Sequence, residues 1–592
     1  MCIRDSFSST EYGGSTITQQ LIKVMTQEDD HKIERKITEI MRAIYMERNC
    51  GYSKDDILEA YLNVLPLSSN IEGVGAAANY YFGKDIKDLS LAQCAAIAGI
   101  TQNPSRFNPY THPENLRRRQ ETVLFKMHQL GFITDDEYIQ ASNEELVFQN
   151  SARRVAVQDY YVDLLIEDIA ADLMEQYGYS YSYAIRMVYY GGLRIYSHEQ
   201  PELQARVEAI YADDANFPTK IETDKQDPQG AIFIMDYEGH TVATAGGRGE
   251  KTANRVNNRS TTSVRQPGSA MKPIAVYAPA ISNNLVHFSS LVPDAPITLP
   301  NGSKWPPNYG SSRPADRGLT TVTYALQRSF NTVPAQLLKQ LTPERSYTFL
   351  TENLQMTTLV SQDIDYAPLA LGGLTYGVSC REMAAAYQVF GNGGYYHKPF
   401  TYERVTADGK TLLEDTYSPI RALDENSAYV MNRLLQRVVR GGTAGSISGS
   451  WGSGWEVYAK TGTTGGSSRS GEYNVYFAGG TPQYVAASWF GYDYDKSLSS
   501  RQTGYAMSLW NKAMLAIRDN NLENKQFTLK GTTEEHTFCS ATGLLVGPEN
   551  NCPSTLVGVY KPDNVPGNCT THLKNPGTGD PAAGTPSTAA AE

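Results

Sequence analysis

Ser269 and Lys272 have the types and the spacing of a nucleophile and its base. They begin and end a Ser-Ala-Met-Lys segment that follows a turn-like Arg-Gln-Pro-Gly sequence at 265–268. If Ser269 begins a helix, Lys272 lies one turn further on, and its amine can reach the serine oxygen. Serine is a weak nucleophile until a base takes its proton, and lysine can be that base only if burial or a nearby cation lowers its pKa far below about 10.4. Because this spacing also arises about once or twice by chance in a chain of this length, the pair alone is a weak signal.

Two further motifs strengthen the signal. Ser329-Phe330-Asn331 starts 60 residues after Ser269, within a sequence that predicts helices, and Lys460-Thr461-Gly462-Thr463-Thr464 precedes predicted strands. Alone, the first could be a helix cap and the second a turn. Together and in this order, beside a Pro-Gly turn and a strand, chance is a remote explanation for them. They predict a nucleophilic serine site.

A second set of polar residues lies near the start of the chain. Residues 13–23 read Gly-Gly-Ser-Thr-Ile-Thr-Gln-Gln-Leu-Ile-Lys, and residues 35–39 read Arg-Lys-Ile-Thr-Glu. Lys-x-x-Ile-Leu-x-x-Tyr-Leu-Asn follows at 54–63, and Arg119-x-x-x-Val-Leu follows later. Capped helices would explain the helical periodicity but not these identities. Amide and cationic side chains are hydrogen-bond donors for an anionic group, and a carboxylate accompanies them here.

The surrounding sequence predicts two kinds of domain. Residues 1–140 predict mostly helices, including Ile33–Glu47 with apolar residues on one face, a helix after the N-cap Ser53, and Leu89–Ile100. Residues 141–228 read as an interdomain linker region. In 229–525, a hairpin over 230–245, helices, and strands within 473–492 predict an α/β domain whose sheet uses both ends of the segment. A small cysteine-containing region (526–574) and a disordered tail (575–592) follow.

Composition excludes several classes of protein. The chain has 592 residues, 41% of them hydrophobic and 19% charged, which excludes a disordered chain and a coiled coil. Its net charge of −11 argues against a nucleic-acid binder. It contains no apolar run near the roughly 18 residues needed to span a bilayer, and its first residues lack the apolar core of a signal peptide.

The seven cysteines include a group near the end, Cys539, Cys552 and Cys569. Two of these three could form a disulfide if the domain lies outside the cytoplasm. The alternative is a zinc site that would recruit His536 or His572. The lack of a Cys-x-x-Cys pair makes zinc the less favoured interpretation, and we expect no metal site.

The three motifs of the second domain resemble those of penicillin-binding proteins and serine β-lactamases. Further segments of the chain are similar to bifunctional penicillin-binding proteins: 191–197, 384–394 and 441–444. The string at 13–23 and the segments at 35–39, 54–63 and 119–124 resemble the second to fifth motifs of peptidoglycan glycosyltransferases. The chain is thus identified as a member of the class A penicillin-binding proteins. The resemblance implies a mostly α, lysozyme-like glycosyltransferase domain followed by an α/β transpeptidase domain of the penicillin-binding and serine β-lactamase kind.

The resemblance also implies roles for individual residues. In the transpeptidase, Ser269 attacks the D-Ala-D-Ala carbonyl of a stem peptide, Lys272 accepts its proton, and Ser329 relays a proton to the leaving amine. Asn331 holds the substrate amide, Lys460 supplies charge, and substrate binding falls to Thr461, Gly462 and Thr463. The backbone N–H groups of Ser269 and Thr463 form the oxyanion hole. In the glycosyltransferase, pyrophosphate is bound by Gln20, Lys23, Arg35 and Lys36, with Glu39 as a catalytic carboxylate.

The family's first motif, with its catalytic glutamate, and its membrane anchor belong upstream of residue 13. Only 12 residues precede it, and we do not assign the base to Glu11. We therefore expect a chain truncated at its start, whose glycosyltransferase half is inactive.

Partners, cofactors and rival functions follow from the same resemblance. The expected partners are lipid II, nascent peptidoglycan stem peptides, β-lactams and a bacterial cell membrane, at its extracytoplasmic face, with no nucleic acid. The transpeptidase calls for no cofactor, whereas a divalent cation is a candidate cofactor of the glycosyltransferase. The alternatives are a serine β-lactamase or DD-carboxypeptidase, which leaves residues 13–124 unexplained, and a non-catalytic β-lactam-binding scaffold.

Overall fold

The structure is a computed structural model that describes the chain in several stretches. The described residues are 15–26, 32–68, 71–149, 157–219, 226–309, 315–407, 409–452, 454–465, 471–494, 496–519 and 526–574. Glu11, the two glycines at 13 and 14, and the expected disordered tail lie outside them.

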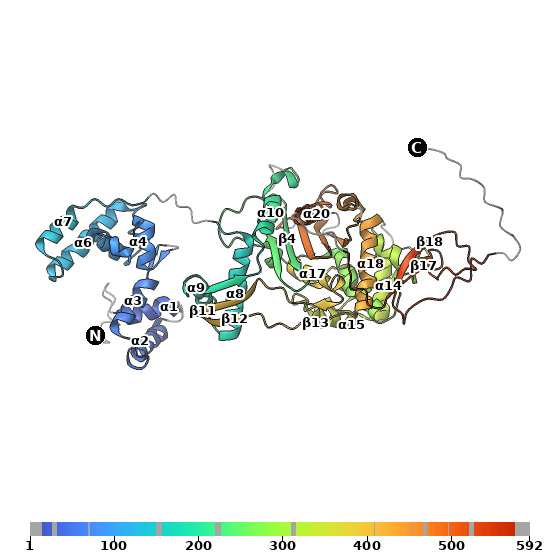
Figure 1. The fold of residues 1–592 in the computed structure, drawn as a ribbon, viewed down its shortest axis with the longest axis horizontal. Helices are drawn as coiled ribbons and strands as arrows, with labels where there is room; N and C mark the ends of the chain where they lie inside the picture. Colours follow the sequence, from blue (N-terminus) through green and yellow to red (C-terminus); the bar gives the residue numbers. More distant parts are fainter. Residues whose placement is uncertain are drawn as a thin grey trace. The chain divides into compact units, whose positions relative to one another are not determined.

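The chain forms two compact units (Figure 1). The first comprises residues up to 156 together with 173–190, and the second comprises 157–172 and everything from 191 onward. The expected linker region, 141–228, is thus shared between the two units. Among the described residues, no helix is both long enough and apolar enough to cross a bilayer.

The first unit is helical, as the sequence predicts. Its elements are α1 (Ile17–Thr26), α2 (Lys32–Asn49), α3 (Lys54–Val64), β1 (Pro66–Ser68), β2 (Ile71–Glu72), α4 (Val74–Phe82), η2 (Ile86–Asp88), α5 (Leu91–Ile100), α6 (Pro113–Gln129), α7 (Asp135–Asn143) and α9 (Tyr181–Tyr190). The predicted cap at Ser53 is confirmed: its hydroxyl accepts from the Asp56 N–H, and the Asp56 carboxylate accepts from the Ser53 N–H. Such a capping box satisfies backbone donors that the first turn of a helix leaves open.

The predicted helix at 33–47 is also confirmed, as part of α2. Its apolar face does not become a core, because Ile33, Ile37, Met41 and Ile44 are exposed among the described residues.

Arg186 of α9 fixes the helices that carry the first candidate site. Its guanidinium donates to the backbone oxygens of Val24 and Val64, at 2.6 and 3.2 Å. These carbonyls lie in the last turns of α1 and α3, where helical carbonyls lack a partner within the helix. Glu72 lies 3.1 Å from the same guanidinium and balances its charge. One arginine therefore ends two helices and joins them to a third.

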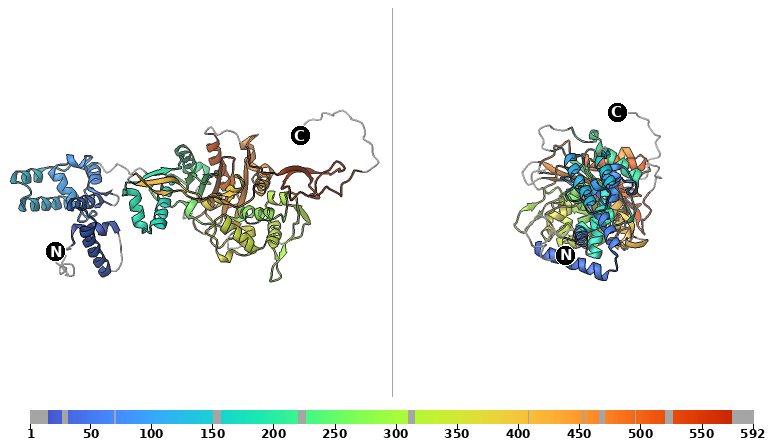
Figure 2. Two further views of the ribbon diagram at one scale, coloured as in Figure 1. Left: turned by 60° about the horizontal axis from the view of Figure 1, so that its bottom comes forward. Right: turned by 90° about the vertical axis from the view of Figure 1, so that its left-hand side faces the viewer.

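A five-stranded antiparallel sheet forms the centre of the second unit (Figures 1 and 2). The strands lie in the order β14 (Tyr458–Gly465), β15 (Glu472–Gly480), β16 (Tyr484–Gly491), β4 (Gln229–Asp236) and β5 (Thr241–Ala245). The predicted hairpin is β4–β5, and β16 pairs with β4 along its whole length. The prediction that the sheet uses both ends of the segment is therefore confirmed.

Helices cover both faces of this sheet, which explains why its strands are largely buried and why β4 and β16 are mostly apolar. The second unit contains α8 (Tyr160–Tyr177, which begins in it), α10 (Pro201–Ala212), η3 (Asp214–Asn216), α11 (Arg259–Thr262), η4 (Gly268–Met271), η5 (Pro273–Tyr277), α12 (Ala278–Ser282), α13 (Val322–Gln327), α14 (Thr332–Leu341), α15 (Pro343–Thr348), η6 (Phe349–Asn353), η7 (Ser361–Asp363), α16 (Tyr366–Leu371), α17 (Cys380–Tyr387), η8 (Gln388–Phe390), α18 (Glu425–Gly441), η9 (Gly445–Ile447), α19 (Ser448–Trp451) and α20 (Tyr505–Arg518). Helices α10 and α20 pack together and against the sheet, α17 packs against its middle strands, and α18 lies along β14.

Short strands complete the unit. They form the sheets β12 (Lys410–Glu414) with β11 (Tyr402–Ala407) and β3 (Arg194–Ser197), β10 (Tyr395–Tyr396) with β13 (Ile420–Arg421), β6 (Leu291–Pro293) with β9 (Leu319–Thr321), β7 (Ile297–Thr298) with β8 (Lys304–Trp305), and β17 (Glu534–Cys539) with β18 (Thr555–Tyr560).

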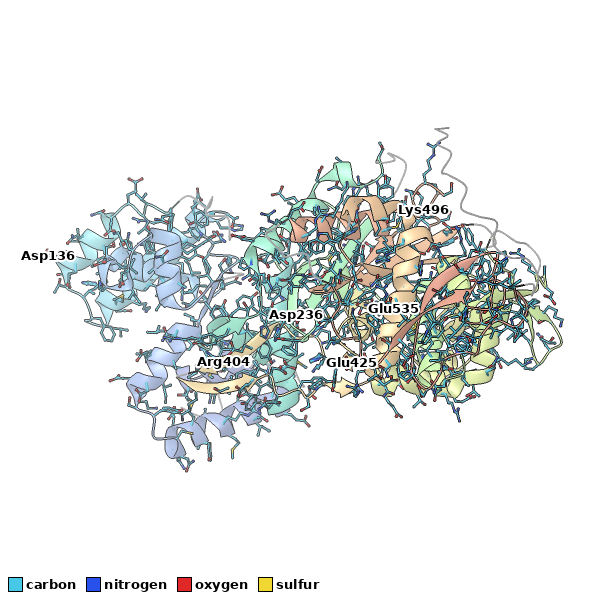
Figure 3. The ribbon with its side chains drawn as sticks, turned by 45° about the vertical axis from the view of Figure 1, so that its right-hand side comes forward. Asp136, Asp236, Arg404, Glu425, Lys496 and Glu535 are labelled. Carbon is cyan, nitrogen blue, oxygen red and sulfur yellow. The ribbon has the colours of Figure 1, made fainter. Side chains whose placement is uncertain are left out.

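The last hairpin, β17–β18, packs on the second unit. Phe538 and Tyr560 are buried in the same core as Phe288. Glu535, labelled in Figure 3, lies 3.8 Å from Arg433 of α18.

Candidate active site

Ser269 and Lys272 lie on one tight turn. Ser269 is within η4, a 3-10 turn, and the Lys272 backbone N–H donates to the Ser269 carbonyl. Side chains three residues apart eclipse one another in this geometry, so both project from the same side. Ser269 is half-buried, whereas the Lys272 side chain is fully enclosed. The structure thus places Lys272 one turn after Ser269, in a tighter turn than the start of an α-helix.

The Lys272 amine is bound to the Ser-Phe-Asn motif. Its Nζ donates to Asn331 Oδ1 at 2.7 Å and to the carbonyls of Ser329 and Phe330 at 2.9 and 3.0 Å, and it lies 3.5 Å from Ser329 Oγ. These are the hydrogen bonds of this amine among the described residues, and Ser269 Oγ, the partner that the sequence predicts, is not one of them. The lysine therefore joins the first motif to the second.

Ser329 is held in a backbone conformation that favours glycine. Its φ is +59°, just after α13, where the Phe330 N–H donates to the Ala325 carbonyl and the Ser329 N–H to that of Leu326. This pattern is a Schellman motif, whose left-handed position is usually glycine. A serine there is strained by about 1–3 kcal/mol, so the surrounding structure must hold it in place.

Buried polar groups fix Asn331 from the opposite side. Asn308 Oδ1 accepts from the Asn331 backbone N–H at 2.7 Å, and Asn308 Nδ2 donates to Asp294 at 2.7 Å. Asn331 Nδ2 donates to the Pro307 carbonyl at 3.0 Å, so its Oδ1 faces Lys272. The sequence offered no signal for Asn308 or Asp294, because single polar residues in a loop have no distinctive spacing.

Lys460 brings the third motif to the same hydroxyl. It lies in β14, and its fully buried Nζ donates to Ser329 Oγ at 2.8 Å and to the Thr461 carbonyl at 3.0 Å. Both lysines therefore converge on Ser329, whose hydroxyl can pass a proton between them.

Burial lowers the pKa of both lysines. Loss of water is the main cause for Lys272, whose pKa falls well below the usual lysine value, and the charge of Lys460 lowers it further. Burial lowers the pKa of Lys460 to about 7. Because two neighbouring cations disfavour each other, the pair cannot easily hold both protons. We assign the neutral amine to Lys272, since it experiences both the burial and the neighbouring charge. In that state its two N–H groups can donate to only two of the three oxygens that surround the amine.

Glycines allow the first and third motif segments to approach at backbone distance. A Cβ on Gly462 would lie 2.1 Å from the Pro267 carbonyl oxygen, and one on Gly268 would lie 2.3 Å from that of Thr463. Gly268 also has a φ of +56°. The edge strand β14 therefore lies directly against the turn that carries Ser269, with the backbone of Thr463 beside it.

A threonine pair extends the site along β14. The hydroxyls of Thr461 and Thr443 lie 2.7 Å apart. Thr443 follows the Gly441-Gly442 turn at the end of α18, in a segment whose family resemblance did not by itself mark Thr443 as a site residue. Thr461 and Thr463 are two residues apart in the strand, so their side chains lie on the same face.

The predicted glycosyltransferase residues are partly brought together. Glu39 is buried in α2, where its carboxylate lies 3.1 Å from Lys36 Nζ and 3.4 Å from Arg35 Nε. Gln20 is exposed and accepts from the Tyr61 hydroxyl at 3.1 Å. Lys23 is exposed on α1, and no hydrogen bond or ion pair among the described residues joins it to the other four.

Family comparisons match these two constellations. The family model for transglycosylases matches residues 3–128, and that for the penicillin-binding protein transpeptidase domain matches residues 230–496. All the candidate residues of the two sites lie within these ranges.

Individual relatives match most of the chain. Penicillin-binding protein 1A of Clostridium botulinum is 33% identical over 531 residues, covering 87% of this chain and 63% of the relative. Penicillin-binding protein 1A of Clostridium tetani is 32% identical, covering 91% and 70%. The chain thus spans less than two thirds of the length of several relatives.

A solved structure shares the fold. Penicillin-binding protein 1A from Haemophilus influenzae aligns with a TM-score of 0.66 at 18% identity, covering 93% of this chain and 94% of that one. With two matched domains in the order that the motifs predicted, this chain belongs to the class A penicillin-binding proteins, which join a transglycosylase domain to a transpeptidase domain.

Proposed function

We propose that the second unit is a serine DD-transpeptidase that cross-links peptidoglycan stem peptides. The observation that carries the proposal is the convergence of two fully buried lysines, Lys272 and Lys460, on the Ser329 hydroxyl. Lys272 also lies one turn after Ser269. A buried lysine with a cationic neighbour loses its proton near neutral pH, which is what a base for serine requires.

Acylation begins when Ser269 Oγ attacks the carbonyl of the penultimate D-Ala and its proton passes to neutral Lys272. The negative oxygen that forms is stabilised by the backbone N–H groups of Ser269 and Thr463, two segments whose close approach Gly268 permits. The bond to the terminal D-Ala then breaks, and its amine takes a proton from Lys272 through Ser329. Thr461 and Thr463 bind the terminal carboxylate, beside the charge of Lys460.

In the second step, transfer of the acyl group to an acceptor, the proton movements of acylation run in reverse. The amine of a second stem peptide attacks the acyl carbonyl, and its proton returns through the same lysine and serine groups. An amide forms between the two stems, and Ser269 regains its hydroxyl. Asn331 holds the donor amide, since its side chain is fixed by Lys272 and Pro307.

For the first unit we propose a lipid II-binding glycosyltransferase site. Arg35 and Lys36 would bind the pyrophosphate, with Gln20 and Lys23 along α1, and the buried Glu39 orients the two cations. Glu39 is also the candidate catalytic carboxylate. The described residues of the first unit do not form a site for the candidate divalent cation, because Glu39 is already engaged by Arg35 and Lys36.

The proposed setting is the extracytoplasmic face of a bacterial cell membrane. Both proposed substrates, lipid II and nascent stem peptides, occur there, and β-lactams would acylate Ser269 as substrate mimics.

A transfer assay tests the transpeptidase. A donor peptide ending in D-Ala-D-Ala is incubated with an amine acceptor, and mass spectrometry measures released D-Ala and the new amide. We expect both with the native chain and with the Ser263→Ala control, and neither with Ser269→Ala. Repeated release of D-Ala without amide would instead support the carboxypeptidase alternative, and a single equivalent of D-Ala with a persistent acyl-enzyme and no turnover would support the scaffold.

A binding assay tests the first unit. Arg35→Ala and Lys36→Ala should each weaken the binding of labelled lipid II in detergent by about tenfold or more, typical of a lost charged hydrogen bond. Lys87→Ala, an exposed lysine of the same unit, serves as the matched control. Unchanged binding in both variants would contradict the assignment.

A further inference from the structure

Three cysteines and a histidine meet at one point beyond the transpeptidase motifs. Cys539 ends β17, Cys552 precedes β18, and Cys569 and His572 follow β18. The sulfur atoms and one imidazole nitrogen all lie within 4.8 Å of one another. Cys539 and Cys569 are buried, and all three thiols are free rather than disulfide-bonded.

The distances are those of a tetrahedral metal site. His572 Nδ1 lies 3.4 Å from Cys539 Sγ and 3.5 Å from Cys569 Sγ. With Zn–S bonds of about 2.3 Å and Zn–N bonds of about 2.0–2.1 Å, a tetrahedral site separates sulfur from nitrogen by about 3.6 Å.

A tight turn holds Cys539 and directs one donor at the sulfur of Cys569. Cys539 begins a tight turn in which the Gly543 N–H donates to the Cys539 carbonyl at 2.8 Å, with a φ of +70° at Gly543. The Thr542 hydroxyl donates to Cys569 Sγ at 3.4 Å. Cys569 and His572 are three positions apart on a second turn, with two residues between them, the close spacing typical of paired zinc ligands. Donors of this kind orient metal-bound thiolates.

We propose that Cys539, Cys552, Cys569 and His572 bind one structural Zn²⁺ ion. Three thiolates and one imidazole in a tetrahedral arrangement are a donor set that zinc prefers, and four protein ligands leave no open position for catalysis. A disulfide between two of the cysteines, which the sequence favoured, would leave a third thiol and the imidazole in the cluster without a role. The other candidate histidine, His536, instead contacts Glu534 at 2.9 Å.

The ion would stabilise a region that has little core of its own. A two-stranded hairpin is marginal in water, and domains of this size commonly need a metal or disulfides. The zinc ligands come from three places along 539–572, so one ion would close two loops at once.

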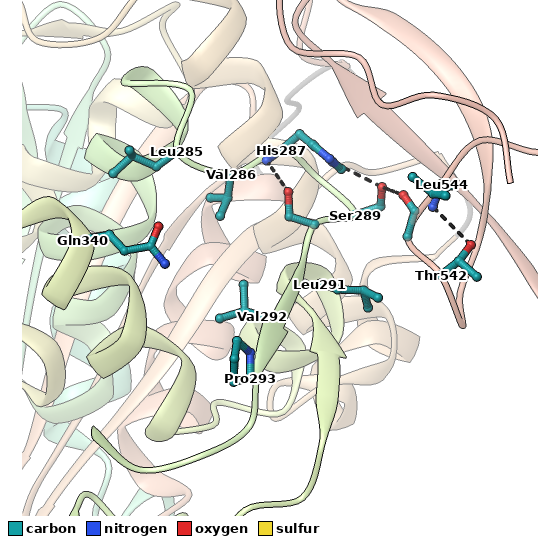
Figure 4. A pocket seen from close by; sticks show the side chains of 12 residues that line it. Leu285, Val286, His287, Ser289, Leu291, Val292, Pro293, Gln340, Thr542 and Leu544 are labelled. Atoms are coloured by element: carbon teal, nitrogen blue, oxygen red, sulfur yellow. Dashed lines mark hydrogen bonds between the residues drawn. The ribbon is translucent and has the colours of Figure 1, made fainter. Parts of the chain in front are cut away.

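The same turn docks the region on the transpeptidase unit. Gly543 O accepts from the Ser289 hydroxyl at 2.5 Å, and the Tyr560 hydroxyl donates to Ser289 Oγ at 2.9 Å. Figure 4 shows Thr542 and Leu544 facing Ser289 and Leu291 across a shared pocket. Fixing the Cys539 turn therefore also fixes this contact.

Metal analysis of the full chain, purified under reducing conditions with added Zn²⁺ and then dialysed, tests the proposal. We expect one zinc per chain and an X-ray absorption spectrum with three sulfur ligands and one nitrogen ligand. Cys552→Ser and His572→Ala should lower zinc content by at least about tenfold, whereas the control His536→Ala should keep it. Zinc removal should also speed proteolytic cleavage within 526–574.

Two measurements keep the outcome decisive. Labelling of Ser269 by a fluorescent penicillin reports whether each variant folds, independently of zinc. The native chain is also alkylated in denaturant, with a chelator and without reductant. All seven cysteines should be modified, because free thiols react and disulfide-bonded cysteines do not. A native chain that takes up no zinc, or whose zinc is not bound by three sulfurs and a nitrogen, would overturn the proposal. A stable disulfide within the cluster, found in a chain that was kept under reducing conditions throughout, would also overturn it. Full zinc content in His572→Ala would do the same.

Discussion

Replacing Lys460 by alanine should raise the pKa of Lys272 and slow acylation. Both amines contact the same hydroxyl, at 2.8 and 3.5 Å from Ser329 Oγ. Their nitrogens are therefore at most about 6.3 Å apart, the sum of the two distances. At an effective dielectric constant of about 20, two unit charges at that separation repel by about 2.6 kcal/mol, which corresponds to a change of about two in pKa. The base would then be neutral up to about a hundredfold less often at low and neutral pH.

The pH dependence of acylation separates this explanation from a mere loss of packing. Lys272 must be neutral to accept the serine proton, so the native rate should rise with pH as Lys272 deprotonates. It should fall again as Lys460, whose pKa burial lowers to about 7, loses its charge. In Lys460→Ala the rising limb should move to higher pH and the falling limb should vanish.

Stopped-flow acylation by a chromogenic β-lactam across a range of pH measures both limbs. Lys460→Arg keeps the charge and should lose less activity than Lys460→Ala, and Lys339→Ala, an exposed lysine of α14, is the matched control. A rising limb that stays in place in Lys460→Ala, or a rate unchanged at neutral pH, would refute the coupling between the two lysines.

Three further substitutions probe how the site is held. Gly462→Ala places a Cβ 2.1 Å from the Pro267 carbonyl oxygen, so acylation should be lost. The melting temperature should also fall, because overpacking lowers the free energy of unfolding by about 1–3 kcal/mol. Ser329→Gly and Ser329→Ala should lose acylation equally, but the glycine variant should be more stable in denaturant by roughly 1 kcal/mol, because φ is +59° there; equal stability would contradict the strain. Asn308→Leu leaves the Asn331 N–H without its acceptor, so it should destabilise the fold by about 1–3 kcal/mol and slow acylation, which thermal melting and acylation kinetics would show; native kinetics would mean that Asn331 is held in another way.

Local sequence predicted the parts of the fold that depend on local physics. The hairpin β4–β5 follows from two apolar runs around Glu238-Gly239, and the start of α3 follows from Ser53 and the acids after it. The convergence of Lys272 and Lys460 on the Ser329 hydroxyl could not be predicted from local sequence. It depends on packing between segments about 190 residues apart in the chain.

The remaining features needed the folded chain. The left-handed φ of Ser329 cannot be read from a residue type that usually avoids it. The exposed face of α2 has the same spacing as a buried one, and Asn308 is an ordinary loop residue by sequence. The cysteine cluster shows the clearest difference: the spacing of Cys539, Cys552 and Cys569 favoured a disulfide, whereas the structure adds His572 to the three sulfurs.

Covalent labelling at Ser269 tests the central claim most directly. The native chain is treated with a penicillin, digested, and analysed by mass spectrometry to find the residue that carries the acyl group. The adduct should be found on the peptide containing Ser269 alone, and Ser269→Ala should show no adduct while keeping the native melting temperature. An adduct on another residue, or labelling that persists in folded Ser269→Ala, would contradict the assignment of Ser269 as the nucleophile.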